Sequence, residues 1–114
     1  MSLADNFNPN SKPKKREKSI ESYFTDKVKA LGGLCFKFIS PGVSGVPDRL
    51  VIYKGCVVFV ELKRPKAKPR KLQKIMIAII RRHGVPAFSF NSKEQVDILL
   101  AKLEKGERLL DVEI

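Results

Sequence analysis

The sequence predicts an α/β fold, a mixed β-sheet flanked by helices in the order helix, three strands, helix, strand, helix. Three segments carry apolar residues at helical spacing, apolar runs of strand length lie between them, and glycine or proline separates the segments. The 114 residues, 43% of them hydrophobic, suit one domain with a real core. We expect residues 19–114 to form that domain and the polar, lysine-rich residues 1–18 to be a flexible basic arm.

The first helix is expected to begin after Ser19, which is a suitable N-cap, and to end at Gly32-Gly33. Its apolar stripe consists of Ile20, Phe24, Val28 and Leu31. Glu21 falls in the first turn, beside this stripe. An acidic residue there suits the helix dipole, and this ordinary role stands beside a functional one.

A short strand follows over residues 34–39, with Lys37 placed among apolar side chains. The next segment, residues 40–47, is a loop rich in glycine and proline that ends directly before Asp48. Glycine lets the backbone approach a ligand closely. A plain connection is the default interpretation of such a loop, but its position beside Asp48 favours a role in a site.

Two apolar runs, residues 50–53 and 56–62, are joined by Lys54-Gly55 and predict a β-hairpin. A two-residue turn pairs Tyr53 with Cys56, and every pair farther out follows by counting. Lysine suits the first position of such a turn less well than Asn or Asp. A bulge or a longer turn would shift the register by one residue and place the charged strand ends on opposite faces.

With the two-residue turn, counting outward places Asp48 opposite Glu61. Opposed side chains on paired strands have Cβ atoms about 4.5–5.5 Å apart, and like charges there destabilise the pair unless something positive lies between them. Lys63 projects from the same face as Glu61 because side chains alternate along a strand. These three residues therefore have the arrangement of a metal site at the edge of an apolar sheet.

The rest of the chain supplies two helices and a strand. Prolines at positions 65 and 69 prevent a helix until about Arg70. The helix that follows should end at His83-Gly84, and its buried stripe should be Leu72, Ile75, Met76, Ile79 and Ile80. Residues 86–90 predict a strand, and Ser92 should cap a third helix. Residues 108–114 could add a last strand or an oligomer contact.

Charge indicates the class of partner. The net charge is +11, and residues 63–92 contribute +9 of it, with nine lysines and arginines and no acidic residue. Such an imbalance favours a polyanion, nucleic acid first and an anionic membrane surface second. No apolar run reaches the roughly 18 residues of a membrane span. The side chains that we expect to contact DNA are Lys37, Ser44, Arg49, Arg64, Lys66, Lys68, Arg70, Lys71 and Lys74.

Cysteine and histidine usage excludes other sites. Cys35 and Cys56 lie inside apolar runs without paired spacing or a nearby histidine, so neither a disulfide framework nor a zinc site is indicated. Buried reduced thiols are typical of a cytosolic protein, and we expect a cytoplasmic location, with DNA. No P-loop segment is present, so a P-loop ATPase is not supported.

Phosphodiester hydrolysis would suit this set of residues. It requires a positioned water, a means to make it nucleophilic, and a counter-charge, and a divalent cation can supply all three. Mg²⁺ or Mn²⁺ could be held by Asp48, Glu61 and a backbone carbonyl, that of Leu62 being the candidate. Lys63 could orient the attacking water or stabilise the transition-state charge.

The motifs Pro47-Asp48 and Glu61-Leu62-Lys63 resemble those of the PD-(D/E)XK nuclease superfamily. With Gly45-Val46 before Asp48, and Leu72-Gln73 at a helix start, the chain looks more narrowly like a VRR-NUC (virus-type replication-repair nuclease) domain over roughly residues 19–105. The resemblance implies a restriction-endonuclease-like core and metal-dependent cleavage of DNA. Small members of the family look like homodimeric resolvases of branched DNA, such as four-way (Holliday) junctions.

The resemblance also implies roles for individual residues. Asp48 and Glu61 would bind the metal and Lys63 would be the catalytic lysine. Glu21 would assist metal or water binding, and Gln73 would orient the site. A non-catalytic, basic nucleic-acid-binding protein is the alternative, in which Asp48–Arg49 and Glu61–Lys63 are ordinary ion pairs at strand ends.

Overall fold

The computed structural model describes residues 19–114; the expected basic arm, residues 1–18, lies outside the described residues. Its elements follow the predicted order: α2 (Ile20–Leu31), β1 (Leu34–Lys37), β2 (Arg49–Tyr53), β3 (Cys56–Leu62), α3 (Lys71–Arg82), β4 (Ala87–Phe90) and α4 (Lys93–Lys105). The fold is thus the expected α/β arrangement of a mixed sheet with flanking helices.

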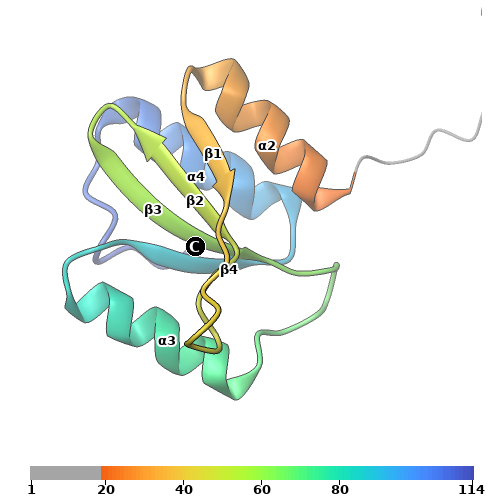
Figure 1. Cartoon of the computed structure of the whole chain (residues 1–114). Coiled ribbons are helices and arrows are strands. Elements are labelled where there is room, and N and C mark those ends of the chain that lie inside the picture. Colours follow the sequence, from red (N-terminus) through yellow and green to blue (C-terminus); the bar gives the residue numbers. More distant parts are fainter. Residues whose placement is uncertain (1–18) are drawn as a thin grey trace, which may run out of the picture.

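The four strands form one sheet in the order β1-β2-β3-β4. β1 pairs antiparallel with β2, and β2 antiparallel with β3, whereas β3 pairs parallel with β4. A parallel pair needs a crossover connection, which α3 provides. Figure 1 shows α2 and α3 at opposite ends of the molecule, with α4 behind the sheet.

The helices begin and end where local signals predict. Ser19 caps α2, its hydroxyl accepting a hydrogen bond from the Ser22 backbone N–H at 3.2 Å. Ser92 caps α4 in the same manner, and Gln95 completes a capping box. Gly32 ends α2 in the left-handed conformation, which glycine adopts without steric cost. Both predicted N-caps and the predicted stop of α2 are confirmed.

The core lies between the sheet and the α2/α4 pair. α2 packs against α4 and β1, and α4 packs against β4. Along β3, Val58 and Val60 are fully buried, while Val57, directly before Val58, is 37% exposed. Because successive side chains of a strand point to opposite faces, one face of the sheet is closed by helices and the other is partly open. Phe38 and Phe59, in edge-to-face contact at 5.4 Å, cover part of the open face.

The predicted buried stripe of α3 is wrong in part. Leu72 and Ile75 are 49% and 45% exposed, and the residue of α3 that is buried is Ile77. The reason is that α3 packs against β4, near the border of the sheet, rather than across it. Periodicity identified the helix correctly but not the angular position of its contact.

The expected final strand is not formed either. Residues 107–114 contain a turn and no strand. Leu109 is buried in the core instead, and the Gln95 side-chain amide donates to the Ile114 carbonyl at 3.4 Å. No helix within residues 19–114 has the length and apolar character to cross a membrane.

Candidate active site

The Lys54-Gly55 turn sets the register of the hairpin. Both residues have positive φ, 46° at Lys54 and 80° at Gly55, as the predicted two-residue turn requires. The pairs run from Tyr53↔Cys56 outward to Arg49↔Val60, which is the register obtained by counting from the sequence. The predicted register is therefore confirmed, and the next position outward places Asp48 across from Glu61.

The backbone holds Asp48 from both sides. Its N–H donates to Glu61 Oε1 at 3.2 Å, and its carbonyl accepts from the Phe38 N–H at 2.7 Å. Pro47, directly before it, is fully buried. The Asp48 backbone is thus held between Phe38, the residue directly after β1, and Glu61 on β3.

Glu61 is a buried carboxylate with a partner on each oxygen. Oε1 accepts from the Asp48 N–H, and Oε2 lies 3.4 Å from the Lys63 ammonium. This contact confirms that Lys63 and Glu61 project from the same face. Burial raises the pKa of Glu61, and the nearby charge of Asp48 raises it further, while Lys63 acts in the opposite direction. The two carboxylates are therefore incompletely compensated by protein groups.

Asp48 supplies the acceptor that fits a cation. Its Oδ1 is buried and has no hydrogen-bond partner, an arrangement that is costly unless a positive group comes to it. The donor set, two carboxylates, suits Mg²⁺, which keeps several of its water ligands, or Mn²⁺. Within residues 19–114 no group of three or more acidic, histidine or cysteine side chains forms a ready metal cluster. The residues present therefore fit a cation held by a carboxylate pair.

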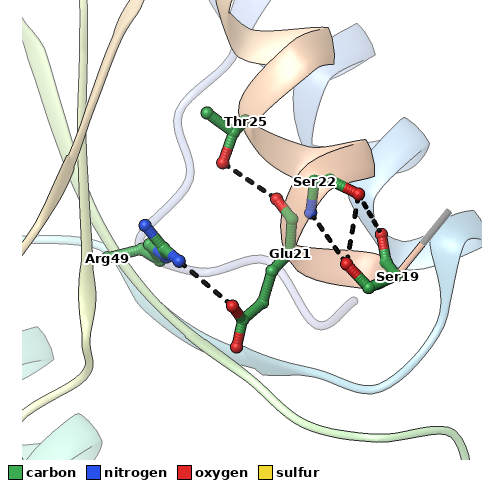
Figure 2. A network of polar contacts seen from close by, with 5 residues as sticks. All are labelled: Ser19, Glu21, Ser22, Thr25 and Arg49. Carbon is green, nitrogen blue, oxygen red and sulfur yellow. Dashed lines mark hydrogen bonds and ion pairs between the residues drawn. The ribbon is translucent and has the colours of Figure 1, made fainter.

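Glu21 is directed at Arg49. Arg49 Nη2 lies 3.3 Å from Glu21 Oε2, an ion pair that joins β2 to the first turn of α2 (Figure 2). The same turn carries the Ser19–Ser22 bonds and a hydrogen bond from the Thr25 hydroxyl to the Glu21 carbonyl. Within the described residues, the hydrogen-bonded partner of the Glu21 side chain is Arg49 and not Asp48 or Glu61. Its predicted part in metal or water binding stays a prediction.

Gln73 contacts its own helix end. Its Oε1 accepts from the Arg70 backbone N–H at 2.9 Å, at the N-cap position of α3. The predicted role of Gln73 in orienting the site stays a prediction.

Gly45 provides a contact that the sequence did not reveal. It has φ +87°, and a Cβ there would lie 2.8 Å from the Leu72 carbonyl oxygen, so the loop before Asp48 rests on the first turn of α3 (Figure 1).

The basic loop between β3 and α3 is held in place. The Asn91 side-chain amide donates to the Ala67 carbonyl at 2.8 Å, and the Ala67 N–H donates to the Arg64 carbonyl at 3.0 Å. Lys66 adopts a positive φ of 66°, which is unusual for a side chain of this kind. Asn91 lies far along the chain, and no sequence motif marked it.

Most of the predicted DNA contacts are free to meet a ligand. Exposed side chains are those of Lys37, Ser44, Arg64, Lys66, Lys68, Arg70, Lys71 and Lys74. Arg49 differs, since its side chain is only 15% exposed. The loop between β3 and α3 and the start of α3 carry the basic side chains at positions 64, 66, 68, 70, 71 and 74, whereas Lys37 lies at the end of β1. A pocket of about 610 Å³ lies beside them, lined by Ser19, Ile20, Glu21, Leu62, Lys63, Arg64, Pro65 and Ala67. Contact with DNA and ligation by the Leu62 carbonyl stay predictions.

Comparison with known proteins gave two informative matches. A solved structure described as a VRR_NUC domain superposes with a TM-score of 0.67 at 37% sequence identity, covering 72% of this chain and 90% of that one. A protein of Acyrthosiphon pisum secondary endosymbiont phage 1, named "Putative nuclease p44", is 49% identical over 59 residues. That match covers 51% of this chain and 63% of the phage protein. No family model matched.

Proposed function

Since the chain belongs to the VRR-NUC domain family, we propose that it is a divalent-metal-dependent endodeoxyribonuclease that acts on branched DNA inside the cell. The single observation that carries the proposal is the opposed pair of Asp48 and Glu61, with a buried carboxylate oxygen that lacks a partner and Lys63 at 3.4 Å from Glu61. The match to a phage protein named as a nuclease supports nuclease activity in general.

In this proposal, Asp48, Glu61 and the Leu62 carbonyl hold Mg²⁺ or Mn²⁺. The bound cation would lower the pKa of a water and polarise the scissile phosphate. Glu61 Oε2 keeps the Lys63 ammonium beside the pocket. From there Lys63 can hydrogen-bond the attacking water or stabilise charge on the phosphate oxygens. Glu21, which lines the same pocket, would orient a water.

The basic loop would hold the DNA backbone. Phosphate contacts of this kind fix register and give affinity without sequence choice. The Asn91–Ala67 hydrogen bond supports this role, because it holds the loop in one conformation before DNA binds. A preformed loop loses less conformational entropy on binding than a mobile one. Selectivity would then depend on the shape of the substrate.

We propose further that the substrate is a four-way junction and that the enzyme acts as a homodimer. A four-way junction has two strands to cut symmetrically, and each chain carries one carboxylate pair. The open face offers a surface for a second copy, since Leu34, Phe36 and Val57 are 53%, 49% and 37% exposed and β1 is an edge strand. Exposed apolar side chains beside a free edge favour self-association.

The activity is tested on linear, flapped, forked and four-way DNA, each with Mg²⁺, Mn²⁺ or EDTA. Cleavage of branched DNA that requires the metal and is lost in Asp48→Asn is the expected result. Asp48→Asn should still bind DNA, because the basic loop is unchanged. An unimpaired cutting rate in this variant would contradict the proposal. Light scattering at cleaving concentrations checks the dimer, and a monomer there would contradict the resolvase.

A non-catalytic nucleic-acid-binding protein remains the second candidate, because Glu61 and Lys63 form the ion pair that it requires. Titration calorimetry with Mn²⁺ separates the two. Saturable binding that is lost in Glu61→Gln supports the enzyme. Absence of binding, together with metal-independent affinity for DNA, supports the binding protein.

A further inference from the structure

We propose that Arg49 is a positioning residue that holds the Glu21 carboxylate at the edge of the pocket containing Lys63. The inference rests on the proposed nuclease function. Arg49 directly follows Asp48, but its side chain points to the opposite face of the sheet, toward α2. It therefore acts on the site through Glu21 and does not touch the reacting atoms.

Stability alone does not account for Arg49. Its side chain is 15% exposed, whereas that of its partner Glu21 is 56% exposed. Its Nε is buried without a hydrogen-bond partner. A half-exposed ion pair contributes little to folding, and a buried donor without a partner is costly. An apolar side chain of similar length would fill the same space without that cost. The charge of Arg49 must therefore serve another purpose.

The position of Glu21 indicates that purpose. Glu21 lines two neighbouring pockets, one shared with Leu62 and Lys63, and one shared with Thr25 and Arg49. Glu21 thus lies where the pocket of the candidate active site meets the pocket that contains Arg49. Figure 2 shows its side chain reaching from the helix to the guanidinium. Among residues 19–114, Arg49 holds Oε2, and Oε1 carries no hydrogen bond, so Oε1 is free to accept from a water.

Arg49 thereby fixes one oxygen of Glu21 and leaves the other for the pocket. Without the guanidinium, an exposed glutamate at the first turn of a helix would sample several rotamers, and few of them would point at Lys63. Partners that orient a metal site from outside typically account for about 10- to 100-fold in metal affinity or activity. We expect an effect of that size here.

The main test replaces Arg49 with a residue of similar length and no charge. Arg49→Met should lower kcat on branched DNA and the affinity for Mn²⁺, measured by calorimetry, about 10- to 100-fold. KM for DNA and DNA affinity in EDTA should change little. Arg49→Lys should recover part of both losses, because a point charge can still reach Glu21. Arg108→Met is the matched control, since it removes an exposed arginine that is paired with Asp111 at 3.2 Å in the C-terminal segment. It should cleave normally.

A double-mutant cycle shows whether Arg49 acts through Glu21. In a Glu21→Gln background, Arg49→Met should cost less than about twofold, because coupled residues are not additive. An equal loss in both backgrounds would overturn the proposal. A fall in DNA affinity that matches the fall in cleavage would also overturn it and would make Arg49 a phosphate contact.

A charge swap covers the case in which Arg49→Met folds poorly. The double variant Glu21→Arg with Arg49→Glu keeps the ion pair and should keep the urea midpoint near that of the wild type. It should not recover cleavage or Mn²⁺ affinity, because the carboxylate has left the pocket edge. Recovery of both cleavage and Mn²⁺ affinity would show that the Glu21–Arg49 ion pair is purely structural. If the wild type itself cleaves no DNA with either metal, the proposed function fails, whereas a cleaving wild type with an unaffected Arg49→Met refutes only this inference.

Discussion

The two ends of the β2–β3 hairpin have opposite properties. At the turn end, Lys54 and Gly55 adopt positive φ values and nothing lies within 4 Å of where a Gly55 Cβ would be. At the other end, Glu61 is buried and accepts from the Asp48 N–H, and Asp48 carries an acceptor without a partner. The turn sets the register of the hairpin and carries no candidate site residue. At the charged end, that register places the two carboxylates opposite each other. Register and chemistry can therefore be perturbed separately.

The largest difference is expected between the two lysines of the hairpin. Lys63→Met should lower cleavage about 100- to 1,000-fold, the usual cost of removing a group that stabilises transition-state charge. Lys54→Met, the matched control at the turn, should leave cleavage unchanged. Single-turnover rates on the preferred DNA measure both. Comparable losses in the two variants would mean that lysine charge acts through general attraction for DNA.

The two glycines should differ next. Gly45→Ala combines a positive φ with a Cβ 2.8 Å from the Leu72 carbonyl oxygen, so we expect a loss of about 2–3 kcal/mol in the free energy of unfolding. Cleavage should fall as well, because the loop that holds Asp48 must move away from α3. Gly55→Ala pays only the backbone cost, about 1–2 kcal/mol, and the molecules that remain folded should cleave normally. Urea unfolding and cleavage assays on the same samples compare them.

The pH dependence of stability is a further difference between the charged end of the hairpin and its turn end. The pKa of Glu61 is raised by burial and by Asp48, so the folded protein binds more protons than the unfolded chain above the ordinary glutamate pKa, about 4.3. The contribution of protonated Glu61 to the free energy of unfolding is fully present below that pH. It is lost as the pH rises through the pKa that Glu61 has in the folded protein. In EDTA, the wild type should therefore lose stability relative to Glu61→Gln as the pH rises. A constant difference from pH 4 to 7 in urea unfolding would contradict this expectation.

The smallest effect is expected at the first turn position. Lys54 is a non-glycine residue at φ 46°, a conformation in which Asn is several-fold enriched. Lys54→Asn should raise the free energy of unfolding by about 0.5 kcal/mol and leave cleavage unchanged. A loss of stability would show that the contact of the Lys54 ammonium with the Tyr53 ring, at 5.4 Å, matters more than the backbone preference.

Local signals made the hairpin and the helix ends predictable. The register followed from one two-residue turn, and Ser19 and Ser92 act as the caps that their positions predict. Packing was harder to predict. Which face of α3 is exposed depends on the packing of that helix against β4. Leu109 is buried in the core, although its segment was expected to form a strand. Neither result is encoded in periodicity.

The candidate site divides in the same way. Asp48, Glu61 and Lys63 belong to one hairpin, so counting along two strands was sufficient to bring them together. Glu21 and Arg49 lie 28 residues apart in the sequence, and their pairing depends on how α2 lies against the sheet. Asn91, which holds the basic loop through Ala67, lies 24 residues from it in the sequence. Contacts between elements therefore need the three-dimensional structure.

The free edge of β1 has a consequence for handling the protein. Within residues 19–114, no strand pairs with the outer edge of β1. This edge and the exposed Leu34 and Phe36 favour association between copies, whereas the +11 net charge drives copies apart. Salt screens that repulsion and, at the same time, weakens phosphate contacts. Raising the ionic strength should therefore favour contact between copies through this edge, including the proposed dimer, while it weakens the binding of DNA.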